Sequence, residues 1–398
     1  MAEDGRSVAG GDHSDDGGST PAKIMRLDRA VVKNDAQPVQ QMTETRLLDL
    51  LSTAKPIQSD ELERSDLPLS DFLSIEIDDP RSIGQSLLWL DQNGYGWAMW
   101  KHLKRARRWA MNEEMEKESA QVLITTMEYY QKLSSDQRSI LDDWITKTGI
   151  LKTVQATSKP PLTRVQYEFS QRYWPSVFHE DGQSKLLSNW PRSLKIEEQR
   201  SIVANMRKAI DIAKVGIGKL RKWNDGNVDS DCGCSKSVIS GCVIIDPVSN
   251  SEIAMASSAL LHSMKNPLLH GVICAVDLVA RSQGGGAYDF GEKGRDCGFR
   301  WWLYEDGREN SEYLCTGYDC YLTEEPCTMC AMALLHSRIR RVYFGQRATD
   351  GALASKLKLH CLNGINHRFE VYGGVLEMEC ASLGEEEGTL SGDLSIGI

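Results

Sequence analysis

Two cysteines and a histidine are the residues whose types and spacing point most directly to chemistry. Cys327 and Cys330 follow Pro326 in a Pro-Cys-x-x-Cys run, and His270 follows an Asn-Pro pair in an earlier apolar segment. Residues three apart on a helix share one face, and the positive end of a helix favours the thiolate that a metal requires. Two thiolates and one imidazole leave one tetrahedral position open, as in catalytic rather than structural zinc sites. The pattern predicts a zinc site made of His270, Cys327 and Cys330.

Each part of this pattern has a simpler interpretation when it stands alone. A lone Cys-x-x-Cys pair also occurs in thioredoxin-like redox sites, and a lone histidine on an apolar helix is more often a satisfied core residue. Their combination on two successive helices, each preceded by proline, favours zinc. A second pair, Cys232 and Cys234, lacks a partner motif, so we expect no second metal there.

The residue two positions after the histidine decides what such a site can do. Nucleobase deaminases combine a His-x-Glu motif with Pro-Cys-x-x-Cys, and their glutamate transfers protons while zinc activates a water. Val272 occupies the glutamate position here. Valine neither gives nor accepts a proton, and general acid–base assistance is worth about 10²–10⁴-fold in rate. Because that glutamate is not a zinc ligand, we expect the metal to be retained and the chemistry to be lost.

Three nearby acids are candidates to replace the missing glutamate. Asp277 lies about two helical turns beyond His270, too far for easy reach. Glu324 and Glu325 directly precede the cysteine helix, where we interpret them as first-turn residues favoured by the helix dipole. We therefore expect none of the three to restore activity.

Longer stretches around both motifs resemble one family. The runs "NPLLHGVICAVDLVARSQGGGAYDF", "LCTGYDCYLTEEPCTMCAMALLHSRIRRVYFG", "GINHRFEVYGGVLE" and the lead-in "PPLTRVQYEFSQRYWPSVFHED" closely resemble the non-catalytic subunit of eukaryotic tRNA wobble adenosine deaminase, in the cytidine/deoxycytidylate deaminase superfamily. The resemblance covers roughly residues 160–380. It implies a zinc-binding, tRNA-binding half of a heterodimer whose catalytic partner keeps the His-x-Glu motif. Together they would convert wobble adenosine to inosine in tRNA anticodons, in nucleus and cytoplasm.

The elements that position these motifs are expected from residue 196 onward. Helical spacing marks residues 196–222, residues 241–257 form a hairpin pattern, and helices are expected to begin at Asn266-Pro267 and at Pro326. Further strands are expected at 318–323, 340–346 and 368–376. The alternation predicts an α/β fold. The resemblance makes residues 196–380 a cytidine-deaminase-like three-layer α/β/α domain around a mixed five-stranded sheet.

The remaining segments carry weaker signals. Residues 1–40 are expected to be a disordered acidic tail: the first hundred residues hold 9 basic and 18 acidic side chains, and the rest hold 37 and 38. Residues 41–155 are expected to be mainly helical, because 97–111 and 120–133 have apolar residues at three- and four-residue spacings. Residues 156–195 look like a linker that packs on the core, 381–398 like a tail, and 282–312 like an irregular Gly-rich insertion.

A basic cluster in the helical region is the candidate RNA surface. A helix would place Lys101, Lys104, Arg105 and Arg108 on one face with Arg107 beside them, and tryptophans flank the cluster. A folded tRNA offers phosphates and a splayed anticodon loop to such a surface. The alternative is a solvated face over a Trp-rich core. A second cluster, Arg338, Arg340 and Arg341, suits packing or a partner interface equally well.

Composition limits the other readings. No apolar run approaches the roughly 18 residues of a membrane span, and eleven cysteines, several in apolar stretches, suit a reducing compartment. Two rival functions remain: a self-sufficient deaminase of free cytidine-type nucleosides, which Val272 disfavours, and an interaction-only pseudoenzyme without RNA. The basic cluster and the close match around both motifs disfavour the second.

Overall fold

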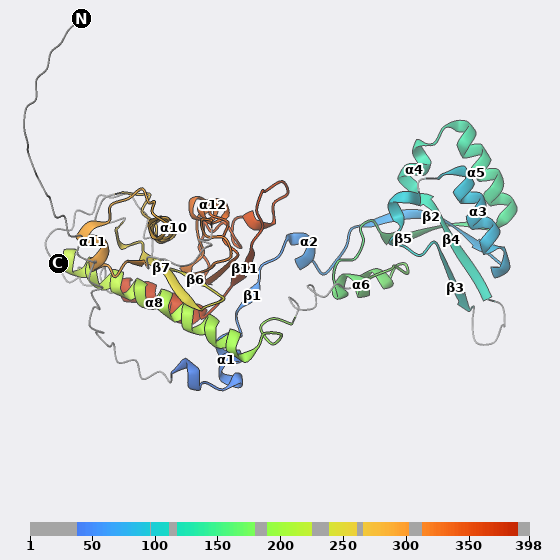
Figure 1. Ribbon diagram of the computed structural model, residues 1–398. Coiled ribbons are helices and arrows are strands. Elements are labelled where there is room, and N and C mark those ends of the chain that lie inside the picture. The colour runs from blue at the N-terminus through green and yellow to red at the C-terminus, as the bar shows by residue number, and fades with distance from the viewer. Residues whose placement is uncertain are drawn as a thin grey trace, which may run out of the picture. The chain divides into compact units, whose positions relative to one another are not determined.

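The computed structural model describes residues 38–95, 97–110, 118–179, 189–224, 239–260, 266–301 and 313–388. Figure 1 shows the order of the elements along the chain. The expected disordered tail falls almost wholly outside the described residues, and so do Cys232, Cys234 and residues 302–312 of the insertion. In the described part of the chain, no helix is both long enough and apolar enough to cross a membrane.

A mixed seven-stranded sheet, in the order β1-β11-β10-β9-β6-β7-β8, carries the cysteine and histidine motifs. Its inner strands are β6 (Gly241–Asp246), β7 (Ser251–Ser257), β9 (Asp319–Glu324), β10 (Arg341–Gln346) and β11 (Glu370–Gly373). Strand β10 runs parallel to β9 and β11, whereas β6 is antiparallel to β7 and β9. The short strands β1 (Lys55–Pro56) and β8 (Arg300–Trp301) extend the two edges. The predicted five-stranded core is therefore present, with one strand added on each side.

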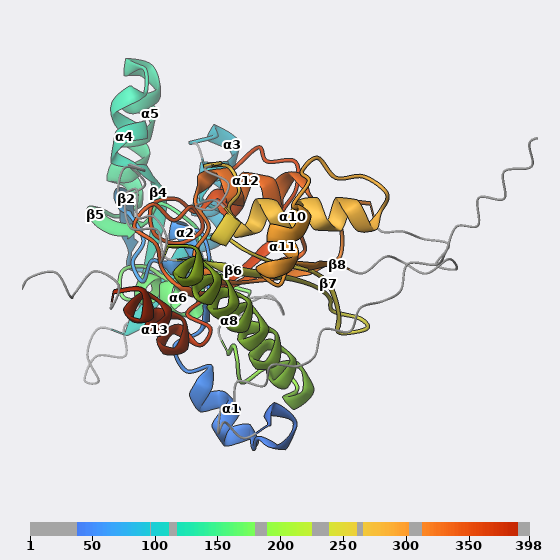
Figure 2. The same cartoon turned by 90° about the vertical axis from the view of Figure 1, so that its left-hand side faces the viewer.

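Helices cover both faces of this sheet, as Figure 2 shows for α8 and α10. On one face lie α1 (Glu44–Leu50), α8 (Ile196–Asn224) and α13 (Glu377–Gly388), and on the other α10 (Gly271–Ser282) and α12 (Thr328–His336). Along β6, Val243 packs toward α8 and Cys242 toward α10, because successive strand residues alternate between faces. These three layers confirm the predicted α/β/α architecture.

Both motif helices begin later than the sequence predicts. Helix α10 starts at Gly271 rather than at Asn266-Pro267, and α12 starts at Thr328 rather than at Pro326. The Asn266 side chain accepts the backbone N–H of Leu268 at 3.1 Å, and this local turn replaces helical bonding. The Pro326 carbonyl accepts a hydrogen bond at 2.9 Å from outside the helix. His270 and Cys327 are therefore the N-cap residues of their helices.

The insertion contains regular structure that the sequence analysis did not expect. Helix α11 (Gly291–Asp296) and strand β8 lie within it. Phe290 and Phe299 are both buried and pack edge to face with ring centroids 5.5 Å apart. This aromatic pair joins the apolar cluster that α10 and α12 form with the sheet, so the insertion is packed on the core in spite of its Gly-rich composition.

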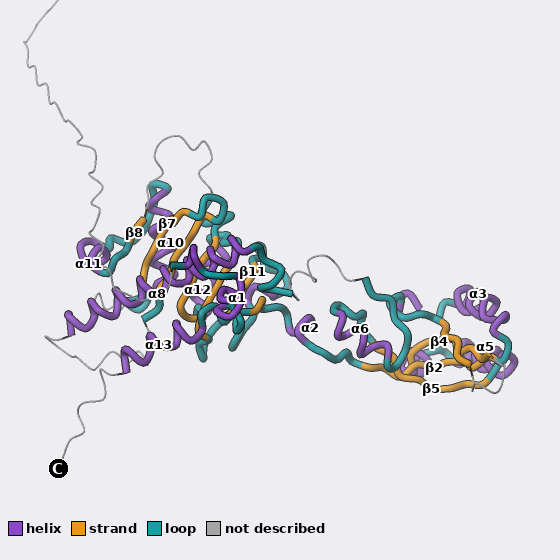
Figure 3. The backbone as a smooth tube through the Cα atoms, turned by 90° about the horizontal axis from the view of Figure 1, so that it is seen from below, coloured by secondary structure: helices purple, strands orange, loops and turns teal. Residues whose placement is uncertain are grey.

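The N-terminal region contains a second, antiparallel sheet in the order β3-β4-β2-β5. Its elements are β2 (Leu69–Ile77), α3 (Ile83–Asn93), β3 (Ala106–Ala110), β4 (Glu118–Thr126), α4 (Met127–Lys132), α5 (Ser135–Thr148) and β5 (Ile150–Thr157). Residues of α3 and α5 pack on one face of this sheet (Figure 3). The order of strands and helices is the ferredoxin-like βαββαβ arrangement. Single-turn helices complete the list: η1 (Val39–Gln41), α2 (Asp60–Glu63), η2 (Pro80–Ser82), η3 (Trp97–Trp100) and η4 (Leu359–Cys361).

The expectation of a mainly helical region holds for α3, α4 and α5, and it is wrong for the described part of residues 97–111 and for the first half of residues 120–133. The first segment contains a single 3₁₀ turn followed by β3, and the second is β4 up to Thr126, after which α4 begins. In β4, Val122 and Ile124 face one cluster and Leu123 faces another, so both sides of the strand are buried. Periodicity alone cannot separate such a doubly buried strand from a helix.

The predicted domain boundaries also differ from the packing. Leu47 and Leu51, placed in the N-terminal region, are buried beside α8, and β1 pairs with β11. Helix α6 (Arg164–Gln171) and the residues after it, placed in the linker, lie beside the four-stranded sheet: the Trp174 indole donates to the Lys104 carbonyl at 2.6 Å. Helix α13 continues through the first residues of the predicted tail.

Candidate metal centre

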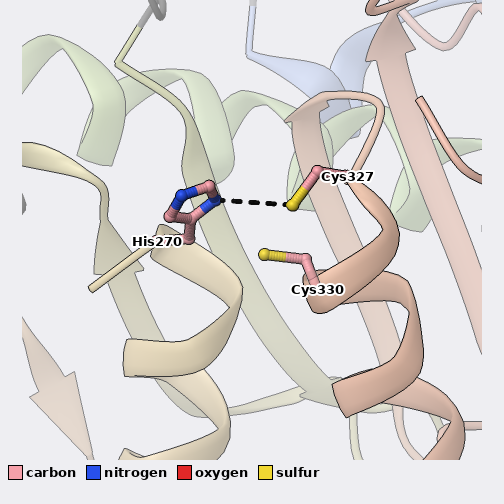
Figure 4. Close-up of side chains that lie close together, drawn as sticks. All are labelled: His270, Cys327 and Cys330. Atoms are coloured by element: carbon pink, nitrogen blue, oxygen red, sulfur yellow. Dashed lines mark hydrogen bonds between the residues drawn. The ribbon is translucent and has the colours of Figure 1, made fainter. Parts of the chain in front are cut away.

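His270, Cys327 and Cys330 meet between the N-terminal ends of two neighbouring helices. One ligand atom from each residue lies within 4.8 Å of the others. The Sγ of Cys327 is 3.7 Å from Nδ1 of His270. Figure 4 shows the three side chains pointing toward one another, with His270 from α10 and both cysteines from α12. The structure thus brings together the three residues that the sequence pattern singles out.

Helix geometry explains why these positions converge. His270 and Cys327 cap α10 and α12, and Cys330 follows one turn later on the side that faces His270. Both helices direct the positive ends of their dipoles toward the cluster, which favours anionic sulfur. The His270 side chain makes no capping bond to α10, and the Cys327 sulfur turns toward Cys330 and His270 inside the cluster. Both side chains are therefore available to a shared ligand.

The two thiols titrate as a pair. The hydrogen bond from Cys330, assisted by His270, lowers the pKa of Cys327 to about 4. The same contact with Cys327, together with burial, raises the pKa of Cys330 far above its usual range. The hydrogen bond with Cys327 also raises the pKa of His270, although burial opposes it. One thiolate therefore exists at neutral pH without a metal, and the second forms when a cation replaces its proton.

The donor set fits zinc. Two sulfurs and one imidazole nitrogen are borderline-soft ligands of the kind that tetrahedral zinc prefers, and their separations allow one small ion to touch all three.

Val272 lies in the first turn of α10, two residues after His270. Its side chain is 5% exposed and belongs to the apolar cluster between the sheet and the two motif helices. This position offers no proton relay. A carboxylate at this position would lose its hydration and would have only apolar neighbours in exchange.

The acids near the site have other partners. The Asp277 carboxylate accepts the backbone N–H of Ala287 at 2.5 Å and pairs with Arg281 at 3.3 Å, so it holds the start of the insertion. Glu325 is 3% exposed and precedes the first turn of α12, so its interpretation as a first-turn residue is wrong. Its carboxylate accepts hydrogen bonds from residues 348–355. No sequence pattern signals this contact, because all of these donors except the Ser355 hydroxyl are backbone amides.

The five predicted RNA-binding cations do not share a helical face, because they lie on a turn and on strand β3. Arg107 and Arg108 point to opposite faces of the sheet. Arg105 pairs with Asp91 and lies 4.8 Å from the Trp97 ring centroid. Arg107 donates to the Gln121 amide oxygen at 2.8 Å, and burial lowers its pKa. Of the five, Lys101, Lys104 and Arg108 are the exposed ones.

The second arginine cluster divides in the same way. Arg340 forms two hydrogen bonds with Asp319 at 2.9 and 2.8 Å, and Arg341 donates to Glu370 at 2.8 Å, so both side chains hold the sheet together. Arg338 is exposed, 5.8 Å from the Tyr313 ring centroid. The packing interpretation is correct for Arg340 and Arg341.

Arg338 belongs to a groove of about 1250 Å³ that the sequence analysis did not anticipate. Its lining includes two more exposed cations, Lys356 and Arg368, and also Lys358, which pairs with Asp60 at 2.8 Å. These cations come from three separate segments, so no local sequence pattern reveals them. None of the metal-site residues lines this groove.

Comparisons with known proteins agree with the site. The family model described as "Cytidine and deoxycytidylate deaminase zinc-binding region" matches residues 228–346. A Danio rerio protein named "Probable inactive tRNA-specific adenosine deaminase-like protein 3" is 39% identical over 235 residues, 58% of this chain and 64% of that protein. Its Homo sapiens namesake is 37% identical over 244 residues, 57% of this chain and 62% of that protein.

A more distant relative, "tRNA-specific adenosine deaminase subunit tad3" of Schizosaccharomyces pombe, is 27% identical over 216 residues, 54% of this chain and 56% of that protein. The chain therefore spans less than two thirds of the length of each of these relatives. These relatives confirm the resemblance seen in the motifs. The family match, together with the three layers of helices, sheet and helices, confirms the deaminase-like fold.

Proposed function

We propose that this chain is the non-catalytic subunit of a heterodimeric tRNA adenosine deaminase, which converts wobble adenosine to inosine in tRNA anticodons. The observation that carries the proposal is Val272 beside a complete set of metal-ligand residues. The relatives support it, because their names combine a tRNA-specific adenosine deaminase with the words "probable inactive" and "subunit".

In this proposal His270, Cys327 and Cys330 hold one zinc ion. When bound, the ion supplies a cross-link between α10 and α12 and neutralises the two thiolates. The three ligand residues then fix α10 relative to α12, and the apolar cluster around Val272 excludes water from the space between these helices. No group at the Val272 position moves a proton.

The missing glutamate implies a partner. A deaminase needs a general acid–base at that position, so a catalytic subunit with an intact His-x-Glu motif would complete the enzyme. The complex would act in the nucleus and cytoplasm, where tRNAs are made and used, and the free cysteines among the described residues fit a reducing compartment.

The exposed cations of the groove support contact with tRNA. Arg338, Lys356 and Arg368 could each neutralise a phosphate, and such contacts fix the position of a nucleic acid without reading its sequence. Lys101, Lys104 and Arg108 remain a second candidate surface. The interaction-only alternative gains some support, because Arg105 and Arg107 are engaged inside the protein.

Purification of the chain from its native cell tests the proposal most directly. We expect a His-x-Glu deaminase and tRNA to co-purify, and we expect inosine formation only from the complex. Turnover of tRNA or of free nucleosides by the single chain would refute the non-catalytic role. A stable partner without tRNA would instead support the interaction-only alternative.

A further inference from the structure

Glu325 lies two residues before the ligand Cys327, and it is surrounded by hydrogen-bond donors. Its Oε1 accepts the backbone N–H groups of Leu353 at 3.0 Å, Ala354 at 2.6 Å and Ser355 at 2.9 Å. Its Oε2 accepts the hydroxyl of Ser355 and the more distant N–H of Ala348, at 3.4 Å. Every one of these contacts has a donor that points at a Glu325 oxygen, and both carboxyl oxygens are used.

All of these donors belong to one stretch, residues 348–355, between β10 and η4. Successive backbone N–H groups that converge on one anion form a concave anion site. Here the anion is the protein's own buried side chain, so the loop is folded around Glu325. We call Glu325 and these donors the latch.

The latch holds the loop of residues 348–355 against Pro326 and Cys327. Gly351 forms an antiparallel β-bridge with Cys327, and Ala352 donates to the Pro326 carbonyl at 2.9 Å. The approach requires glycine, because a Cβ at position 351 would lie 2.1 Å from the Glu325 carboxyl carbon. The backbone that carries the first thiolate is thus fixed by the loop on one side.

The other side of this segment is held by the sheet. The N–H of Glu325 donates to the Gln346 carbonyl at 2.8 Å and continues the pairing of β9 with β10. The position of this backbone sets where the Cys327 sulfur can reach, and from there the sulfur contacts Cys330 and, at 3.7 Å, Nδ1 of His270. Both restraints on that backbone therefore meet at Glu325.

We propose that Glu325 is a positioning residue for the metal centre: the latch holds the Cys327 thiolate where it shares an ion with Cys330 and His270. This inference rests on the proposed zinc role and adds a residue that is not itself a ligand. Partners that orient a ligand from outside the coordination sphere typically contribute 10–100-fold to metal affinity.

The test measures metal affinity in the full chain. After zinc removal, Zn²⁺ is titrated in competition with a chromogenic chelator, and Co²⁺ is titrated separately because its visible spectrum reports ligand geometry. We expect Glu325→Ala to weaken zinc binding about 10–100-fold and to alter the cobalt spectrum. Glu325→Gln should lose less, because its amide oxygen can still accept the three N–H groups.

Two controls separate positioning from general destabilisation. Asp319 is equally buried, at 3% exposed, and is the first residue of β9, the strand that ends just before Glu325; it pairs with Arg340. Asp319→Ala should lower the unfolding temperature and leave zinc affinity unchanged. Gly351→Ala displaces the carboxylate without removing it and should weaken zinc binding, whereas Gly84→Ala, with open space around it, should have no effect.

Wild-type zinc affinity and an unchanged cobalt spectrum in Glu325→Ala and Gly351→Ala would overturn the assignment. Equal losses of zinc affinity in Asp319→Ala and Glu325→Ala would overturn it as well, because they would indicate a general effect of destabilisation. A wild-type chain that binds no zinc would instead refute the proposed metal centre itself.

Discussion

The guanidinium carbon of Arg107 lies 4.2 Å from the ring centroid of Trp174. This contact joins β3 to the segment that follows α6. Arg107→Ala should therefore lower the free energy of unfolding by about 1–3 kcal/mol, through the lost cation–π contact and the lost bonds to Gln121. Lys101→Ala, at an exposed position, should stay within about 0.5 kcal/mol of wild type. Urea denaturation followed by tryptophan fluorescence measures both. Equal effects would contradict the separation of packed from exposed cations.

Zinc content should depend on Cys330. Elemental analysis of the purified chain should find about one zinc per molecule in wild type and almost none in Cys330→Ala. The variant should also be less stable, since metal binding is coupled to folding. Cys315→Ala is the matched control, because Cys315 is a buried free cysteine outside the ligand set. Equal zinc in all three proteins would reject these ligands.

Zinc affinity should rise with pH. The pKa of Cys327 is lowered to about 4, so this sulfur is already a thiolate at neutral pH, whereas the raised pKa of Cys330 means that its proton leaves when zinc binds. One released proton gives about a tenfold gain in affinity per pH unit. Below the raised pKa of His270 a second proton is released and the dependence steepens. Competition titrations in buffers of several pH values check this, and a flat profile would argue against Cys330 as a ligand.

Val272→Glu should not create an enzyme. The position is buried in an apolar cluster, so the new carboxylate should cost about 1–3 kcal/mol of stability. Inosine formation should be assayed for the variant alone, and for the variant paired with a catalytic subunit that lacks its own glutamate. Val272→Ala controls for the change in packing. Activity in either glutamate-containing sample would show that only this residue separates the site from catalysis.

The groove cations should contribute to tRNA affinity. Changing Arg338, Lys356 and Arg368 together to alanine should weaken binding by the complex and flatten its salt dependence by about one unit of slope per lost phosphate contact. A charge-matched control changes Arg46, Lys132 and Lys147, exposed cations with acidic neighbours on their own helices. Equal losses of affinity in the two triple variants would indicate a general charge effect and no groove site.

The metal cluster was predictable because its information is local: residue type, spacing and a helix start after proline. Even so, the helix starts were misplaced, because the Asn266 turn and the hydrogen bond to the Pro326 carbonyl depend on surrounding structure. The shared helical face expected for Lys101, Lys104, Arg105 and Arg108 was wrong for a different reason. In residues 97–111 apolar and basic residues alternate in a way that fits a helix, and only pairing with β4 makes part of the segment a strand.

Glu325 and the groove lie beyond the reach of such patterns. Apart from the Ser355 hydroxyl, the donors to Glu325 are backbone amides 23 to 30 positions later. Backbone amides have the same chemistry in every non-proline residue. The groove cations come from segments that only the completed sheet brings together. Motif spacing can therefore identify a ligand, but it does not reveal the contacts that orient the ligand.

The pairing of β1 with β11 affects how this protein is made. The Thr53 hydroxyl donates to the Gly374 carbonyl at 2.7 Å, across 321 positions of sequence. A ribosome therefore releases Leu47, Leu51 and β1 before the elements that they contact have been synthesised. The four-stranded sheet lies between them in the sequence and is translated in full first. Contacts of such long sequence separation form late and slowly. Nascent chains should therefore expose Leu47 and Leu51 to chaperones until α8 has been synthesised, and β1 should stay unpaired until β11 follows.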